Sequence, residues 1–271
     1  MGFFQRFKNL FIETDNSSSS KDSSISVGSV KKGAKKLSQN IGETEAICPY
    51  CHKKLEKKPS RKTKCPHCEN YIYKRTRPFD DADILIRKDQ IDQIDEEWSI
   101  VNGSHDIYLK EKHREKRIRD GMRERFGKEP ADDDVEFRVL NDQAVEAEFA
   151  GDWGFARNYR LNMAKNLEKR KSHELSLRMY FHVCFLDING PNNRSGMQSV
   201  DLDKYPYFTP KSGFLAPGVI KRMKKLISKL EFDEEDCKQG FVEVNKPIFE
   251  GSPTPLSPET AWLKLKKELI E

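Results

Sequence analysis

Four of the six cysteines stand in two C-x-x-C pairs, and thiolates at this spacing are typical ligands for a zinc-like metal ion. Cys48-Pro-Tyr-Cys51 is followed, after thirteen residues, by Cys65-Pro-His-Cys68. Each pair can form a tight turn that directs both sulfurs at one point, so two such turns predict a closed tetrahedral shell of four sulfurs. A full shell leaves no position for water. We therefore expect one structural Zn²⁺ and regard an iron–sulfur centre as the less favoured occupant.

The remaining cysteines, Cys184 and Cys237, are isolated in the sequence. Cys184 lies in an apolar stretch, which predicts a buried and unreactive thiol. Residues 1–12 lack the features of a secretory signal, so metal binding is favoured over disulfides for the paired cysteines. A cytoplasmic location follows as an expectation. No run of ~18 apolar residues is present, so no membrane-spanning helix is expected.

Basic residues are concentrated around the cysteine pairs. Residues 1–79 carry 17 Lys and Arg against 7 Asp and Glu, a balance of +10, whereas residues 80–271 have a balance of −5. Cations that neutralise phosphates, beside aromatics that stack on bases, predict contact with DNA or RNA. The residues assigned to this contact are Lys53, Lys54, Lys57, Lys58, Arg61, Lys62, Lys64, Tyr71, Tyr73, Lys74, Arg75 and Arg77. The alternative is that the lysines only keep an exposed loop soluble and the tyrosines pack the small module.

The rest of the chain divides by composition into further segments. Residues 1–12 form an amphipathic N-terminal segment, in which apolar side chains within 3–11 share one helical face that could dock on the body, on a partner or on a membrane surface. Residues 13–45 are a Ser- and Lys-rich linker. The cysteine module covers residues 46–79, connecting helices cover 80–129, and a helical domain covers 130–271.

The helical domain is predicted from apolar residues at helical spacing. We expect helices over 132–150, 152–169, 172–187 and 217–230, and a last helix that starts at Pro258. Short joints between the first three require antiparallel hairpins to cover their apolar faces. Residues 241–249 are expected to be extended. The predicted fold is a small β module followed by a mainly α-helical domain, an α-hairpin bundle.

Two resemblances extend these predictions. With their cysteine pairs and the following Tyr71-Ile-Tyr73, residues 46–75 resemble the zinc-ribbon class, which implies two β-hairpin knuckles and a strand at 71–73. His52 and Glu69 stand where that class usually has glycine. Gly151-Asp-Trp-Gly-Phe-Ala156 and the helices around it, over 140–188, resemble tetratricopeptide-type hairpins, which implies a groove for a peptide or protein. The same order of parts resembles uncharacterised bacterial or phage zinc-ribbon proteins.

Catalytic motifs are missing from the sequence, which contains no phosphate loop, dinucleotide fingerprint, nucleophile elbow or H-E-x-x-H helix. We therefore expect no enzyme and no small-molecule substrate. The main hypothesis is a zinc-ribbon binding or adaptor protein that contacts nucleic acid through its ribbon and a protein through its helical domain. A second is a pure protein–protein adaptor with a structural zinc knob. A third is a hydrolase with a pocket lined by His173, His182 and Asp187.

Overall fold

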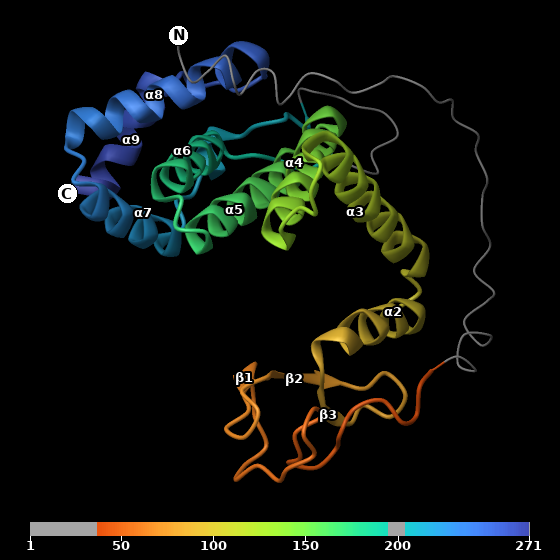
Figure 1. Ribbon diagram of the computed structural model, residues 1–271. Helices are drawn as coiled ribbons and strands as arrows, with labels where there is room; N and C mark the ends of the chain where they lie inside the picture. The colour runs from red at the N-terminus through yellow and green to blue at the C-terminus, as the bar shows by residue number, and fades with distance from the viewer. Residues whose placement is uncertain (1–36, 195–203, 271) are drawn as a thin grey trace, which may run out of the picture. The chain divides into compact units, whose positions relative to one another are not determined.

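The computed structural model describes residues 37–194 and 204–270, which fall into two compact units divided between Tyr108 and Leu109. Unit 1 contains a small sheet near the cysteines, and unit 2 is helical (Figure 1). The division lies inside α3, His105–Phe126, within the segment expected to hold connecting helices. The predicted docking segment 3–11 lies outside the described residues.

The sheet of unit 1 separates two small apolar clusters. Its antiparallel strands are β1 (Thr63–Lys64), β2 (Tyr71–Thr76) and β3 (Asp83–Ile86), in the order β1-β2-β3. Successive side chains of a strand point to opposite faces. Leu85 accordingly packs with the cysteines, whereas Ile84 and Ile86 pack against Ile94 of α2, Ile91–Val101, which follows the short 3₁₀ helix Lys88–Gln90. The indole nitrogen of Trp98 donates to Thr76 O at 2.9 Å and attaches α2 to β2.

The expected linker ends earlier than residue 45. Ile41 is only 5% exposed, in the cluster beneath α2. Glu43 and Leu85 exchange two backbone hydrogen bonds of 2.9 and 2.8 Å, so this segment covers the free edge of β3. A Cβ atom on Gly42 would lie 2.8 Å from the Ile84 side chain, which explains a glycine at this close approach. The correction has a simple cause, because an uncovered strand edge leaves unpaired backbone groups.

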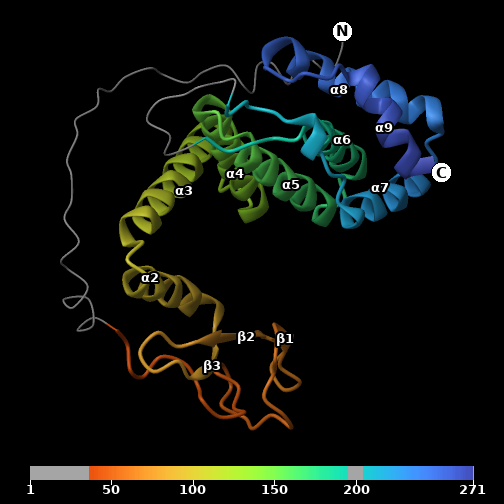
Figure 2. The ribbon, with the colours of Figure 1, turned by 180° about the vertical axis from the view of Figure 1, so that it is seen from behind.

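After α3, three successive antiparallel helices continue the helical unit, as predicted. They are α4 (Asp132–Ala150), α5 (Trp153–Lys169) and α6 (His173–Asn189). Neighbouring members of the series lie side by side (Figures 1 and 2). The later helices α7 (Pro217–Leu230), α8 (Glu234–Gly251) and α9 (Pro258–Ile270) contact α6, which is buried almost throughout its second half. No helix in the described ranges is long and apolar enough to cross a membrane.

The prediction of an extended segment over 241–249 is wrong, because these residues belong to α8. Asp233 caps this helix by accepting a hydrogen bond from Asp236 N at 2.9 Å. Cys237, Phe241 and Asn245 are buried at intervals of four, the period of a helix face. Phe241 packs against the rings of Phe181, Phe185 and Trp262 with centroids 5.8–6.2 Å apart.

A loop after α6 fixes the start of α5. Gly190 has φ +67°, and a Cβ atom there would lie 2.1 Å from the carbonyl oxygen of Thr209. The two residues also share a backbone hydrogen bond, from Thr209 N to Gly190 O at 2.8 Å. Further along the loop, Oδ1 of Asn193 accepts from Phe155 N at 2.8 Å and satisfies one of the free amides in the first turn of α5.

Candidate metal centre

The four paired cysteines converge on one point. Sγ of Cys48 lies 3.7 Å from Sγ of Cys68, and Sγ of Cys51 lies 3.9 Å from Sγ of Cys65. All four sulfurs lie within 4.8 Å of one another. A tetrahedral ion with metal–sulfur bonds of about 2.3 Å needs sulfur–sulfur separations of about 3.8 Å. The sulfurs are thus within metal-binding distance of a single ion and too far apart for disulfides, which require about 2.05 Å.

Both C-x-x-C turns have the same backbone hydrogen bonds. In the first turn, His52 N donates to Cys48 O at 2.9 Å, and Cys48 N donates to Lys53 O at 3.0 Å. The second turn repeats the two bonds at 3.0 and 2.9 Å, with Cys65, Glu69 and Asn70 in the corresponding places. In each turn, these two hydrogen bonds hold the backbone around the pair of cysteines and so help to fix the positions of both sulfurs.

The residue after each turn adopts the left-handed conformation that favours glycine. His52 has φ +56° and Glu69 has φ +58°. These are the two positions at which the sequence departs from the usual ribbon glycine. The geometry is retained without glycine, at the cost of backbone strain at two non-glycine residues.

Hydrogen bonds and burial act in opposite directions on the thiols. The backbone N–H and then the side-chain amide of Asn70 face Sγ of Cys68 and lower the pKa of that thiol to about 7. Burial raises the pKa of Cys48 to about 12, despite N–H groups from Cys51 and Tyr50. Near neutral pH, the thiol of Cys68 is therefore far more readily deprotonated for a metal ion than the thiol of Cys48. Asn70 therefore contributes to the cysteine site by donating hydrogen bonds to Sγ of Cys68, a role that the cysteine spacing alone does not reveal.

Apolar side chains hold the cysteine turns against the sheet. Leu55, Ile72 and Leu85 are at most 6% exposed and pack with Cys48 and Cys65. In addition, the hydroxyl of Tyr50 accepts a hydrogen bond from Lys88 N at 2.9 Å. Tyr50 thereby joins the first turn to the residues that lead into α2.

The basic residues assigned to nucleic-acid contact separate into two groups. An exposed group consists of Lys53, Lys54, Lys57, Arg61, Lys62 and Lys64. The remaining cations are at least partly covered, and most of these have structural partners. The ammonium group of Lys58 donates to the carbonyl oxygens of Thr44 and Asp83, and Lys74 pairs with the Asp83 carboxylate at 2.6 Å.

Arg77 is the clearest departure from the sequence assignment. Its guanidinium makes two hydrogen bonds to Asp80, of 2.8 and 2.6 Å, and the residue is only 9% exposed. Asp80 raises the pKa of Arg77, and Arg77 lowers the pKa of Asp80. Its charge is therefore compensated within the turn between β2 and β3, and this geometry does not support a nucleic-acid contact by Arg77.

Among the assigned tyrosines, Tyr71 is the one with an exposed ring. It is 45% exposed, and the ammonium groups of Lys62 and Lys64 lie 4.4 and 5.6 Å from its ring centroid. Tyr73 is half-buried and joins the cluster beneath α2. One aromatic surface framed by two lysines is thus available beside the strand pair β1-β2.

Two of the residues considered for a hydrolase, His182 and Asp187, are buried in the helical unit. Asp187 accepts a bidentate interaction from Arg157 at 2.7 and 2.6 Å. Burial, together with the smaller effect of nearby Arg160, lowers the pKa of His182 to about 3. Burial also raises the pKa of the Cys184 thiol, which contacts Sδ of Met223 at 3.4 Å. This geometry supports packing roles for these groups.

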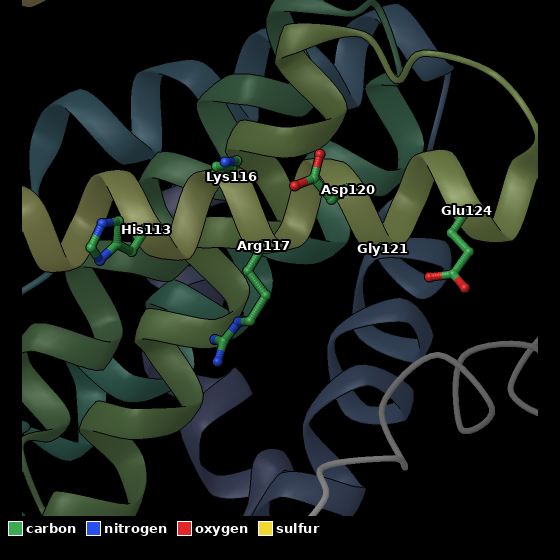
Figure 3. Close-up of a pocket in the computed structure, with 6 residues that line it drawn as sticks. All are labelled: His113, Lys116, Arg117, Asp120, Gly121 and Glu124. Carbon is green, nitrogen blue, oxygen red and sulfur yellow. The ribbon is translucent and has the colours of Figure 1, made fainter.

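A hollow on α3 was not anticipated from the sequence. It has a volume of about 540 Å³ and is lined, within the described residues, by His113, Lys116, Arg117, Asp120, Gly121 and Glu124. Figure 3 shows that all six come from this single helix. Their spacing places charges of both signs along one helix, which gives the hollow no charge preference.

Comparisons with protein-family models, with curated proteins and with solved structures find no match for this chain.

Proposed function

We propose that the four cysteines bind one Zn²⁺, which organises unit 1 as the zinc ribbon that the sequence resembles. Four soft thiolates at tetrahedral separations suit this ion. With every position filled by sulfur, the ion has a structural role. The paired turns, the residues packed behind them and the Asn70 contact support this assignment.

We further infer that this module binds the backbone of a nucleic acid, while the helical unit contacts a protein. The observation that supports nucleic-acid binding is the exposed cation group, two members of which, Lys62 and Lys64, lie over the ring of Tyr71. Residues 46–79 contain ten Lys and Arg and two Asp and Glu, a balance of +8. Four thiolates and Zn²⁺ together carry a charge of about −2, which leaves the loaded module strongly positive. Lysines neutralise phosphates without reading bases, so binding should depend little on sequence.

Salt titration of the zinc-loaded chain with labelled DNA and RNA tests this function. The test variant combines Lys53→Gln, Lys54→Gln, Lys57→Gln and Lys62→Gln. The control combines Lys128→Gln, Lys165→Gln, Lys171→Gln and Lys246→Gln, which removes the same charge from exposed positions in unit 2. We expect the test variant to weaken binding and to reduce the slope of log K against log salt by up to about 0.9 for each lost contact.

Equal effects of the two variants would show that net charge alone causes binding, and no binding at low salt would remove the nucleic-acid half of the proposal.

A stacking contact should also make Tyr71→Ala lose affinity for single strands more than for duplexes. Tyr73→Ala is not a suitable control for Tyr71→Ala, because it opens the cluster beneath α2. Lys62→Arg is preferable as the control, because it keeps both the Tyr71 ring and the positive charge over that ring.

The pure adaptor is the second candidate, and exposed aromatics at one end of a helical hairpin favour it. Phe149 is 89% exposed and Phe155 is 46% exposed, on either side of the turn between α4 and α5. Exposed aromatics are common anchors in protein interfaces. If the chain is a pure adaptor, Phe149→Ser with Phe155→Ser should abolish capture of a protein partner, whereas the four lysine substitutions in the ribbon should leave capture unchanged. Nucleic-acid binding should then be absent.

A further inference from the structure

Helix α7 has a sharply divided surface. Val219, Ile220, Met223 and Leu226 are buried in the main core of unit 2. The opposite surface carries the α7 lysine face, defined as Lys221, Lys224, Lys225 and Lys229, all of which are exposed. Their spacings of three and four residues place them along one side of the helix. The helix sequence, residues 217–230, contains no Asp or Glu.

Compensated charge is common elsewhere in the unit. Arg222, on the same helix, pairs with Glu168 at 2.9 Å. Lys169 pairs with Asp133 at 2.6 Å, and Lys266 of α9 pairs with Glu234 at 2.5 Å. In contrast, the α7 lysine face makes no ion pair with any residue of the described ranges. Like charges at these spacings destabilise an isolated helix, so an anionic partner along this row of four lysines would relieve the repulsion between them.

From these observations we propose that the α7 lysine face is a second, sequence-independent binding surface for the phosphate backbone of a nucleic acid. The row from Lys221 to Lys229 extends about 12 Å along the helix, at about 1.5 Å per residue. Duplex DNA presents a phosphate about every 3.4 Å along each strand, so several phosphates lie within reach.

The composition of the face favours phosphates over other anionic partners. Lysine is depleted in protein interfaces, where aromatic residues and arginine supply the anchors, and the α7 lysine face contains neither. Membrane-bound amphipathic helices insert an apolar surface, but the apolar surface of α7 is occupied by the core of its own unit. Flexible, strongly hydrated ammonium groups suit a regular row of phosphates.

A second surface would change how the whole chain binds. The proposal adds to the nucleic-acid function inferred for the ribbon, although the α7 lysine face could bind without it. Two weak surfaces on one chain raise the effective concentration of the second contact once the first has formed. The loss of either should therefore weaken binding to long nucleic acid more than binding to short fragments.

Fluorescence anisotropy of the full zinc-loaded chain, with duplex DNA in a range of salt concentrations, tests the proposal. The test variant combines Lys221→Gln, Lys224→Gln, Lys225→Gln and Lys229→Gln. All four side chains are exposed, so the fold should be retained, and circular dichroism checks this. The control is the dispersed variant Lys128→Gln, Lys165→Gln, Lys171→Gln and Lys246→Gln. We expect at least a tenfold loss of affinity at low salt and a salt slope reduced by about 2–4 for the α7 variant alone.

A variant in which all four lysines of the α7 lysine face are replaced by arginine should keep the affinity and the salt slope of the wild type, because it retains the four positive charges. Equal losses in the α7 variant and the dispersed control would overturn the proposal. It would also be overturned if vesicles containing phosphatidylserine lost binding with the α7 variant while duplex binding stayed unchanged. The ribbon variant, measured in parallel, reports separately on the proposed function: loss in that variant alone keeps the ribbon surface and removes the α7 surface.

Discussion

The cysteine module and the helical unit bury apolar side chains on different scales. Within the described residues, the cluster around the sulfurs contains five buried residues, two of them cysteines, and the cluster beneath α2 contains four. The main core of the helical unit contains 17 buried residues, including Phe181, Phe185, Phe241 and Trp262. Domains with so small a core usually need a metal or disulfides. From this comparison we expect unit 1 to depend on a bound ion and the helical unit to depend on aromatic packing.

The largest effect should follow from removal of the metal. Cys65→Ser with Cys68→Ser removes both sulfur ligands of the second turn. Structural zinc contributes about 10–16 kcal/mol to the folding of small zinc domains, so its loss should have a large effect. We expect native mass spectrometry to show no bound zinc. Amide hydrogen exchange should show loss of protection over residues 41–101, with residues 153–189 still protected. Cys237→Ala, in the helical unit, is the control and should retain one zinc; full protection of 41–101 without metal would contradict the comparison.

The second-largest effect should follow from a substitution in the aromatic core of the helical unit. Phe241 is fully buried among three aromatic rings, so Phe241→Ala should destabilise the helical unit by about 3–5 kcal/mol. Chemical denaturation monitored by near-ultraviolet circular dichroism measures this change. Zinc content should be the same as in the wild type. A loss of zinc in this variant would mean that the two units do not fold independently.

Acid should weaken the helical unit through His182. Burial lowers its pKa to about 3, whereas the unfolded chain has a value of about 6.5. The unfolded state then binds the proton more tightly, so stability is complete above about pH 6.5 and falls by up to about 1.4 kcal/mol per pH unit below it. Urea unfolding at pH 7 and pH 4.5 should show a smaller difference for His182→Gln than for the wild type. Equal differences would assign the acid sensitivity to other groups.

The smallest effect should come from the strained residue after the second cysteine turn. Glu69→Gly relieves a positive φ and should stabilise the module by about 0.5–1 kcal/mol. Competition with a chelator should show a few-fold gain in zinc affinity. Glu69→Ala keeps the strain and should show no gain. An equal gain for both variants would attribute the effect to the lost carboxylate.

Much of the local structure was predictable from sequence because its signals are local. The cysteine spacing identifies the four converging sulfurs, and Pro217 and Pro258 start α7 and α9 at the predicted positions. The extended segment over 241–249 was wrong because α8 is defined by which side chains meet α6, and this depends on tertiary packing.

The properties of individual cations were less accessible from sequence. Lysines around the cysteines look equivalent along the chain, but Lys58 reaches Thr44 and Asp83, which lie 14 and 25 positions away. Arg77 is compensated by Asp80 only because the turn after β2 brings the two groups together. Charge counting predicts the basic character of a segment, whereas the availability of each cation depends on which groups the fold brings beside it.

The contact between Gly190 and Thr209 limits how this chain can diversify. In a saturation-mutagenesis library selected for folded protein, position 190 should accept no other amino acid, because any side chain would push the two loop segments apart. Loss of that contact would also displace Asn193 from the first turn of α5. A single hydrogen atom in place of a side chain thus decides whether α5 and α6 keep their junction.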